Sequence, residues 1–179
     1  VDWDVGAAAV KTRGGNMDFE ARTARRIVTT GCGQGTMFGS LMEQIDKVKL
    51  PPAAHARISQ STLHTLNDAM RRTDSVHRRA GSVHGCALFR GTEMLTFVED
   101  VGRHNAVDKV VGAMLLDDRL PLAGHALAVS GRTSFEIVQK AWIAGIGFIC
   151  AVSAPSSLAI DLATAAGITL LGFAREGGF

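Results

Sequence analysis

Three short apolar runs in the second half of the chain constrain the fold more than any other feature. They cover residues 126–129, 147–152 and 168–173, and segments typical of helices separate them. Strands and helices that alternate at these lengths favour parallel pairing with right-handed crossovers. Because the runs are apolar along their whole length, we expect helices to cover both faces of the sheet. The sequence therefore predicts a three-layer α/β/α fold around a mixed, mostly parallel sheet.

The segments around these runs complete the expected fold. Residues 83–89 and 94–98 predict the two strands of a hairpin. Thr133 and Glu136 have the spacing of a capping box, which predicts the start of another helix. Further helices are expected at 53–72, 99–116 and 156–166, short strands at 5–11 and 26–30, and a basic loop, either solvated or facing an anion, at 73–81.

Size, charge and cysteine usage limit the classes of function. The 179 residues, 46% of them hydrophobic, allow one compact domain or a domain with a small appendage, and a single domain is expected to span 1–179. The formal net charge is only +2, and no run of like charge exceeds two residues, which argues against a nucleic-acid binder. No apolar run approaches the roughly 20 residues that a membrane span needs. The three cysteines are far apart, so we expect a cytoplasmic protein without a disulfide framework or a structural metal.

A glycine-rich segment around Cys32 is the first candidate for chemistry. The run TTGCGQGT at 29–36 places a glycine on either side of the cysteine and a third at Gly35. Such glycines permit a positive φ and leave the sulfur uncrowded. Backbone N–H groups that converge there would favour the thiolate and lower the pKa of Cys32. A structural turn with an incidental cysteine is the alternative, and residues 31–50 are expected to form a mobile loop.

Polar loops follow several of the predicted strands. They lie at 99–105, 130–134, 153–157 and 175–178. The carboxyl ends of parallel strands meet at one edge of a sheet, and helix N-termini at such an edge bind anions. Each loop alone could be no more than a helix cap, but together they favour a phosphate-bearing ligand. The expected contacts are Gly102, Arg103, His104, Ser130, Gly131, Arg132 and Ser134, with a purely structural role as the alternative for His104.

The segment 99–109, with the sequence EDVGRHNAVDK, resembles a motif of the FdhD family. This family consists of formate dehydrogenase accessory proteins that act as sulfur carriers. The resemblance extends from about residue 25 to the last residue, and the family's N-terminal segment is expected to be missing, as in a truncated member. Further blocks of the family resemble segments 83–88, 130–141, 153–159 and 172–175.

This resemblance implies a cytidine-deaminase-like fold, a homodimer and a task. The family takes persulfide sulfur from a cysteine desulfurase and passes it to the molybdenum bis(molybdopterin guanine dinucleotide) cofactor of formate dehydrogenase. The cofactor would be a bound substrate, and a guanine nucleotide would serve as an analogue of part of it.

By the same resemblance, Cys32 corresponds to the first cysteine of a Cys-Gly-x-Cys loop and would hold the persulfide. Gly35 stands where the family has the second cysteine, so Cys32 would have to act alone. Cys86 and Cys150 lie in apolar, strand-like segments and are expected to be buried and unreactive. The family's cofactor-binding tail corresponds to Phe173, Ala174, Arg175, Glu176, Gly177 and Gly178.

Other functions fit parts of the same sequence. A zinc-dependent deaminase shares the implied fold, but it needs a His-x-Glu motif and a Pro-Cys-x-x-Cys motif. The segment His84-Gly85-Cys86 lacks the glutamate, and no Cys-x-x-Cys occurs in the sequence. A chaperone that binds the cofactor without moving sulfur is the main alternative, because the second loop cysteine is missing. A regulator that binds guanine nucleotides without any need for a thiol is a further one.

Overall fold

The computed structural model describes residues 4–6, 26–28, 36–38, 50 and 57–174. The chain divides into two compact units, residues 1–45 and 46–179, and each is described by itself. In the first unit, β1 (Arg26–Val28) pairs antiparallel with β2 (Thr36–Phe38). The strand expected at 26–30 is therefore confirmed over 26–28.

Several expectations for the first unit stay predictions. Residues 4–6 form a turn, so the strand expected at 5–11 does not begin at Val5, and the rest of it lies outside the described residues. The mobile loop expected at 31–50 also lies outside them, apart from β2 and Leu50. The single domain over 1–179 stays a prediction as well.

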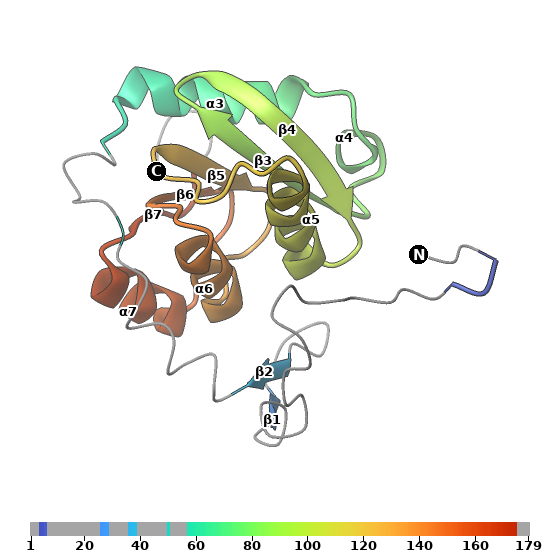
Figure 1. The fold of residues 1–179 in the computed structure, drawn as a ribbon. Coiled ribbons are helices and arrows are strands. Elements are labelled where there is room, and N and C mark those ends of the chain that lie inside the picture. Colours follow the sequence, from blue (N-terminus) through green and yellow to red (C-terminus); the bar gives the residue numbers. More distant parts are fainter. Residues whose placement is uncertain (1–3, 7–25, 29–35, 39–49, 51–56, 175–179) are drawn as a thin grey trace. The chain divides into compact units, whose positions relative to one another are not determined.

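The second unit is built on one mixed sheet of five strands (Figure 1). The strands are β3 (His84–Arg90), β4 (Glu93–Asp100), β5 (His125–Val129), β6 (Phe148–Ala151) and β7 (Thr169–Leu171). They are arranged in the order β4-β3-β5-β6-β7. β3 pairs antiparallel with both β4 and β5, whereas β6 pairs in parallel with both β5 and β7. This confirms the expected hairpin and the parallel pairing of the three apolar runs.

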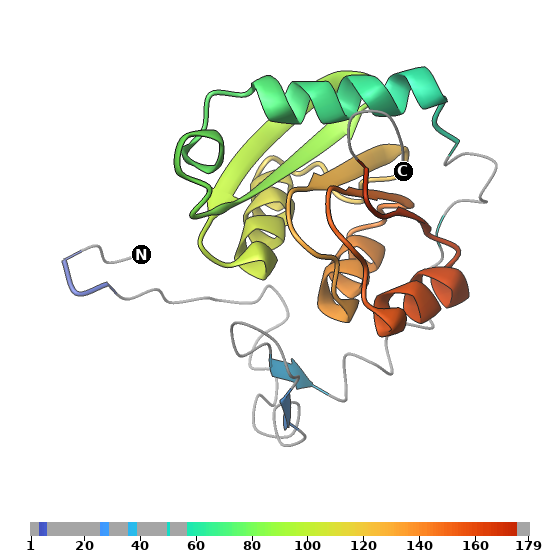
Figure 2. The same ribbon diagram turned by 180° about the vertical axis from the view of Figure 1, so that it is seen from behind.

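Helices cover both faces of this sheet, as Figure 1 and Figure 2 show from opposite sides. The helices are α3 (Gln60–Arg72), α4 (Val76–Ala80), α5 (Arg103–Leu116), α6 (Phe135–Ile143) and α7 (Ser157–Ala166). α3 lies on one face, and α5, α6 and α7 lie on the other, which confirms the α/β/α architecture. No helix in the described ranges has the length and apolar character to cross a membrane.

An apolar core joins α3 to the sheet. Leu63 and Leu66 of α3 are buried in it, one helical turn apart. Neighbouring strand residues point to opposite faces, so every second residue of β3, β5 and β6 turns towards α3. These residues are Ala87, Phe89, Ala126, Ala128, Phe148 and Cys150. The residues between them, such as Leu88, face the side of α5 and α6 and are also buried.

α4 is a short helix where the sequence predicted a loop at 73–81. The Glu99 carboxylate at the end of β4 accepts hydrogen bonds from Val76 N at 2.9 Å and from His77 N at 2.6 Å. These bonds satisfy N–H groups that the first turn of a helix leaves without partners. Glu99 lies 23 residues after Val76 in the sequence. Hydrophobic periodicity is read in windows of about 11–18 residues, so no local pattern could reveal this cap. The loop prediction was therefore wrong over α4.

Three helix starts also differ from the predictions. α3 begins at Gln60 rather than at 53, and α5 begins at Arg103 rather than at 99 because β4 continues as far as Asp100. The N-cap of α6 is Ser134 and not Thr133, so the predicted capping box was wrong. Thr133 forms a parallel bridge to the loop after β6 instead. Its Oγ1 is buried and has no hydrogen-bond partner in the part of the chain that the structure describes.

Replacing Leu66 by alanine tests the core between α3 and the sheet. Leu66 is 0% exposed, and Leu66→Ala is expected to lower the free energy of unfolding by about 2–5 kcal/mol through lost burial and the cavity left behind. Chemical denaturation followed by circular dichroism measures this loss. The matched control is Leu116→Ala on α5, where the side chain is 89% exposed; a change within about 0.5 kcal/mol is expected there. Equal losses in the two variants would contradict the packing of α3.

Candidate functional site

Four loops meet at the edge of the sheet where β4, β5, β6 and β7 end. His104 Nε2 lies 2.7 Å from Ser134 Oγ, which joins the loop before α5 to the loop before α6. Two backbone hydrogen bonds, of 2.9 and 3.3 Å, join Thr133 to the loop at 153–156. A third, of 3.3 Å, joins Phe173 N after β7 to that same loop. The polar loops that the sequence placed at one edge therefore do share it, as far as they are described.

Reciprocal hydrogen bonds hold the start of β3 against this edge. Gly85 N donates to Ser130 Oγ at 2.9 Å, and Ser130 N donates to Gly85 O at 3.0 Å. His84 and Arg103 thereby lie close to Gly131. A Cβ atom on Gly131 would lie 3.0 Å from His84 Nδ1 and 3.6 Å from Arg103 Cδ. Any side chain at this position would displace the imidazole, so the glycine allows His84 and Arg103 to pack together.

His84, Arg103 and His104 form what we call the basic cluster, in which Arg103 carries the permanent charge. Arg103 Nε is buried and has no hydrogen-bond partner among the described residues. Burial lowers the pKa of His84, and the Arg103 cation lowers it further. Burial and then Arg103 also lower the pKa of His104, while the Glu136 carboxylate acts in the opposite direction. Both imidazoles are therefore neutral near neutral pH, and an anion would meet one cation with an unused donor.

The hydroxyl of Ser134 contacts a histidine instead of capping its own helix. Ser134 is the N-cap of α6, but its side chain makes no capping hydrogen bond. Besides the Ser134 hydroxyl, His104 Nε2 has Glu136 Oε2 at 3.8 Å. His104 therefore ties the start of α5 to the start of α6 through the Ser134 hydroxyl.

Asp100 fixes the loop that leads into α5. Its Oδ1 accepts hydrogen bonds from Gly102 N at 2.8 Å and from Asn105 Nδ2 at 3.2 Å, and its Oδ2 lies 2.6 Å from Lys109 Nζ. The hydrogen bond from Lys109 is the largest cause of the lowered pKa of Asp100. A Cβ atom on Gly102 would lie 3.1 Å from Asn105 Nδ2, so the glycine lets this loop close around the carboxylate.

The expected loop contacts lie on these joined loops. They are Gly102, Arg103, His104, Ser130, Gly131, Arg132 and Ser134, of which Arg132 is exposed to solvent. Their roles in binding stay predictions, because no ligand is present.

The expected tail contacts are described only at their start. Phe173 is 56% exposed and has a φ of 54°, a backbone strain that costs about 1–3 kcal/mol and often marks functional sites. Ala174 is 1% exposed and its methyl group packs in the α3 core, so only its backbone could meet a ligand. Cys32, Arg175, Glu176, Gly177 and Gly178 lie outside the described residues, and their roles stay predictions.

His84 lies beside Arg103 at this edge, whereas the sequence favoured a structural role for it and did not place it among the expected contacts. It is the first residue of β3, and β3 runs antiparallel to β5, so the start of β3 meets the end of β5. The sequence holds one signal for His84, because it is a polar residue at the start of an otherwise apolar strand of the predicted hairpin. The missing information was that β3 inserts between β4 and β5, which the local sequence does not reveal.

The two described cysteines are unsuited to sulfur transfer. Cys86 and Cys150 are each 1% exposed, which confirms that they are buried. Burial raises the pKa of the Cys86 thiol and raises the pKa of Cys150 to about 12. Cys150 Sγ also donates a hydrogen bond of 3.4 Å to Asn67 Oδ1. Because the thiolate is the reactive form of cysteine, both side chains are poor nucleophiles.

The zinc-deaminase alternative gains no support from the described part of the chain. No three His, Cys, Asp or Glu side chains gather there in a way that could hold a metal ion. His84, the histidine of the motif considered, lies beside the Arg103 guanidinium. The permanent positive charge of Arg103, which also lowers the pKa of His84, disfavours the binding of a metal cation to the same imidazole.

Comparison with protein families assigns the chain. The model described as the FdhD/NarQ family matches residues 1–179. The chain belongs to the FdhD/NarQ family. The resemblance of segment 99–109 and the other blocks to the FdhD family is thereby confirmed.

Three relatives of this FdhD/NarQ member carry the name sulfur carrier protein FdhD. The protein of Mycobacterium tuberculosis is 47% identical over 146 residues, which cover 80% of this chain and 51% of the relative. That of Streptomyces coelicolor is 42% identical over 171 residues, or 93% and 60%. That of Sulfurisphaera tokodaii is 37% identical over 166 residues, or 92% and 62%. The chain thus spans about half to three-fifths of the length of these curated relatives.

A solved structure shares the fold of this FdhD/NarQ member. It is the crystal structure of a candidate formate dehydrogenase accessory protein from Desulfotalea psychrophila. The two structures superpose with a TM-score of 0.61 and 26% sequence identity, over 86% of this chain and 67% of the other. The match supports the α/β/α architecture.

His84 and His104 are expected to titrate below the ordinary histidine pKa of 6.5. Arg103→Gln removes the nearby cation, so the pKa of both rings should rise towards the ordinary value. NMR signals of the imidazole C–H groups, followed as a function of pH, measure both changes. Arg72→Gln, at the far end of α3, is the matched control and should leave both titrations unchanged.

The same lowered pKa values make stability depend on pH. The unfolded chain takes up protons at these two positions more readily than the folded chain does. The free energy of unfolding should therefore fall as the pH drops below 6.5 towards the lowered pKa values. Arg103→Gln should make this fall shallower. An equally steep fall in the variant would contradict the influence of Arg103 on the two rings.

Proposed function

We propose that the protein is a sulfur carrier that acts on the molybdenum bis(molybdopterin guanine dinucleotide) cofactor for formate dehydrogenase. Cys32 accepts sulfur from a cysteine desulfurase and passes it to the cofactor, which is the substrate. Support comes from relatives named sulfur carrier protein FdhD and from a related structure described as a candidate formate dehydrogenase accessory protein. The chain has three cysteines, and the burial of Cys86 and Cys150 leaves Cys32 as the candidate carrier.

The proposed chemistry needs one reactive thiolate. The Cys32 thiolate attacks the outer sulfur of the persulfide on the desulfurase. A new S–S bond forms, the old one breaks, and the donor cysteine leaves as a thiolate with the electron pair of that bond. In the second step, a reduced molybdenum centre of the substrate would supply the electron pair for a new bond to the outer sulfur and would be oxidised by two electrons. The S–S bond would break at the same time, and Cys32 would leave as a thiolate with the electron pair of that bond. A difficult transfer is thus divided into two steps through a covalent intermediate.

The binding half of the proposal depends on one observation, the unused donor of Arg103 at the edge where the loops meet. A guanine dinucleotide carries a diphosphate, and a guanidinium binds phosphate oxygens through paired hydrogen bonds. Arg132 and the start of α6 lie on the adjoining loop and add further donors. The exposed ring of Phe173 offers a surface on which a base could stack. The tail from Phe173 to Gly178 would complete the guanine end of the site.

The proposed setting follows from the family. We propose a cytoplasmic homodimer that takes sulfur from a cysteine desulfurase and serves formate dehydrogenase. A guanine nucleotide is the proposed analogue of the bound substrate. The net charge of +2 gives no reason to propose a nucleic acid as a partner.

A chaperone that binds the cofactor without moving sulfur is the second candidate. The observation that favours it is Gly35, which stands where the family resemblance places a second loop cysteine. Both candidates use the same edge of the sheet for the cofactor. They differ in whether the Cys32 thiol is needed, so sulfur loading separates them.

Incubation with a cysteine desulfurase and L-cysteine is expected to add one sulfur atom to Cys32. Intact-mass spectrometry with peptide mapping measures the addition and its position. Cys32→Ser should gain no sulfur, whereas the matched control Cys150→Ala should gain it as the native protein does. A native protein that binds guanine nucleotides but gains no sulfur would overturn the carrier function and favour the chaperone.

Guanosine diphosphate is expected to bind Arg103→Gln at least about ten-fold more weakly than the native protein, because a charge-assisted hydrogen bond is lost. Guanosine, which has no phosphate, should be affected by less than about two-fold. Isothermal titration calorimetry measures both affinities. Arg90→Gln, at the opposite end of β3, is the matched control. Equal losses for the two ligands would contradict a phosphate contact of Arg103.

A further inference from the structure

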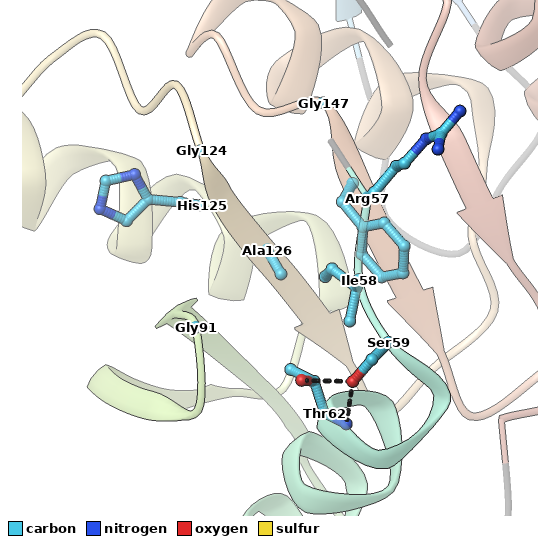
Figure 3. Close-up of a pocket in the computed structure, with 10 residues that line it drawn as sticks. Arg57, Ile58, Ser59, Thr62, Gly91, Gly124, His125, Ala126 and Gly147 are labelled. Atoms are coloured by element: carbon cyan, nitrogen blue, oxygen red, sulfur yellow. Dashed lines mark hydrogen bonds between the residues drawn. The ribbon is translucent and has the colours of Figure 1, made fainter. Parts of the chain in front are cut away.

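A cavity of about 190 Å³ lies at the edge of the sheet opposite to the candidate site (Figure 3). Its lining comes from the starts of β5 and β6, the turn between β3 and β4, and the residues at the start of α3. β5 and β6 run in parallel, so the loops of the candidate site follow their ends while this cavity adjoins their starts. Among the proposed contacts that the structure describes, which end at Ala174, none lines the cavity.

The inner wall of the cavity is apolar. Ile58, Ala126 and Phe148 line it, and all three belong to or pack against the α3 core. Gly91 and Gly124 lie at the rim beside open space, since a Cβ atom on either one would have no neighbour within 4 Å. An engineered apolar cavity of about 150 Å³ in another protein accommodates benzene. A volume of 190 Å³ therefore has room for one six-membered ring with a small substituent.

The polar groups of the cavity lie at the mouth. Ser59 Oγ accepts a hydrogen bond from Thr62 N at 3.1 Å and lies 2.9 Å from Thr62 Oγ1, so the start of α3 already has its cap (Figure 3). The imidazole of His125 points away from Ile58 and Ser59, and its Nδ1 lies 3.1 Å from the Ala123 carbonyl oxygen (Figure 3).

The charged side chain among the lining residues is Arg57, whose guanidinium extends away from Ile58 and Ser59 in Figure 3 and would have to turn towards the cavity to meet a ligand. The Arg57 side chain is exposed and makes no ion pair within the described part of the chain. Among the described residues that line the cavity, none is an aspartate or a glutamate. A cation that has no carboxylate partner among the described residues, next to an apolar slot, suits a ligand that is both aromatic and negatively charged.

We propose that this cavity binds a small aromatic carboxylate of about the size of benzoate. The ring lies against Phe148 and Ile58, where it removes apolar surface from water. The carboxylate pairs with the Arg57 guanidinium, whose planar fork matches two carboxylate oxygens. As far as the chain is described, this site shares no residue with the proposed sulfur-carrier function, and its test uses different ligands and variants, so the two proposals fail independently.

NMR of the native ¹⁵N-labelled protein tests the site with three probes. Benzoate has both the ring and the charge, benzyl alcohol has the ring alone, and acetate has the charge alone. Benzoate at millimolar concentration should shift the backbone amide signals of Gly91, Gly124, Gly147 and Phe148 in a saturable way. Benzyl alcohol should shift them more weakly, and acetate should not shift them. The absence of saturable shifts with benzoate, or shifts confined to other residues, would overturn the proposal.

Two variants distinguish the contribution of the Arg57 charge to benzoate binding from that of the apolar cavity. Arg57→Gln should weaken benzoate binding by about five-fold and leave benzyl alcohol unaffected. Thr62→Phe should abolish the binding of both, because the new ring fills the mouth. The matched controls on α3 are Arg72→Gln and Thr65→Phe, at exposed positions away from the cavity, and both should bind benzoate as the native protein does.

Arg57 precedes α3 and lies outside every helix and strand, so Arg57→Gln decides the assignment of the charge even if Thr62→Phe does not fold. Native affinity for benzoate in Arg57→Gln would overturn the role of Arg57. Native affinity in a folded Thr62→Phe would overturn the position of the ring.

Discussion

The opposite pairings on the two sides of β5 place the described part of the candidate site. β3 is antiparallel to β5 and β6 is parallel to it, so the start of one strand and the ends of two others meet at one edge. The hydrogen bonds between Gly85 and Ser130 hold this register at that edge. A shift of one residue would turn every side chain of β3 to the opposite face and move His84 away from Arg103. The chemistry of the edge therefore depends on strand register before it depends on any single side chain.

The charge of Arg103 stays available because the carboxylates around it have other partners. Glu99 caps α4 through two backbone N–H groups, and Asp100 binds Lys109 and its own loop. Asp108 on α5 forms an ion pair with Lys140 on α6. The histidines beside Arg103 have lowered pKa values, so they are neutral near neutral pH and add no second positive charge. Within the described residues, the Arg103 cation thus has no carboxylate partner at the place where the loops converge, which is what a phosphate-bearing ligand needs.

Hydropathy patterns predicted the strands of the sheet. They did not predict α4, the position of His84 or the cavity, because these depend on contacts between residues far apart in the sequence. The apolar runs at 126–129, 147–152 and 168–173 became β5, β6 and β7, because buried parallel strands need continuous apolar sequence. The segment 73–81, expected to be a loop, contains α4. The side chain that caps this helix, Glu99, comes from β4, so the local sequence does not predict the helix. The polar loops predicted the edge of the site but not His84, which reaches it through strand order. The cavity beside Arg57 combines residues from four separate segments, and no pattern within one segment predicts it.

The connection between the loop before α6 and the loop at 153–156 is made by main-chain atoms. Thr133 N and O form the two hydrogen bonds, and its hydroxyl takes no part in them. Amide and carbonyl groups are the same in nearly every residue, so this joint tolerates exchange of the side chains that project from it. Substitutions on either loop can accordingly retune what the edge recognises while the spacing between the loops persists. The ligand specificity of this edge can therefore change during evolution while the main-chain hydrogen bonds keep the two loops in place.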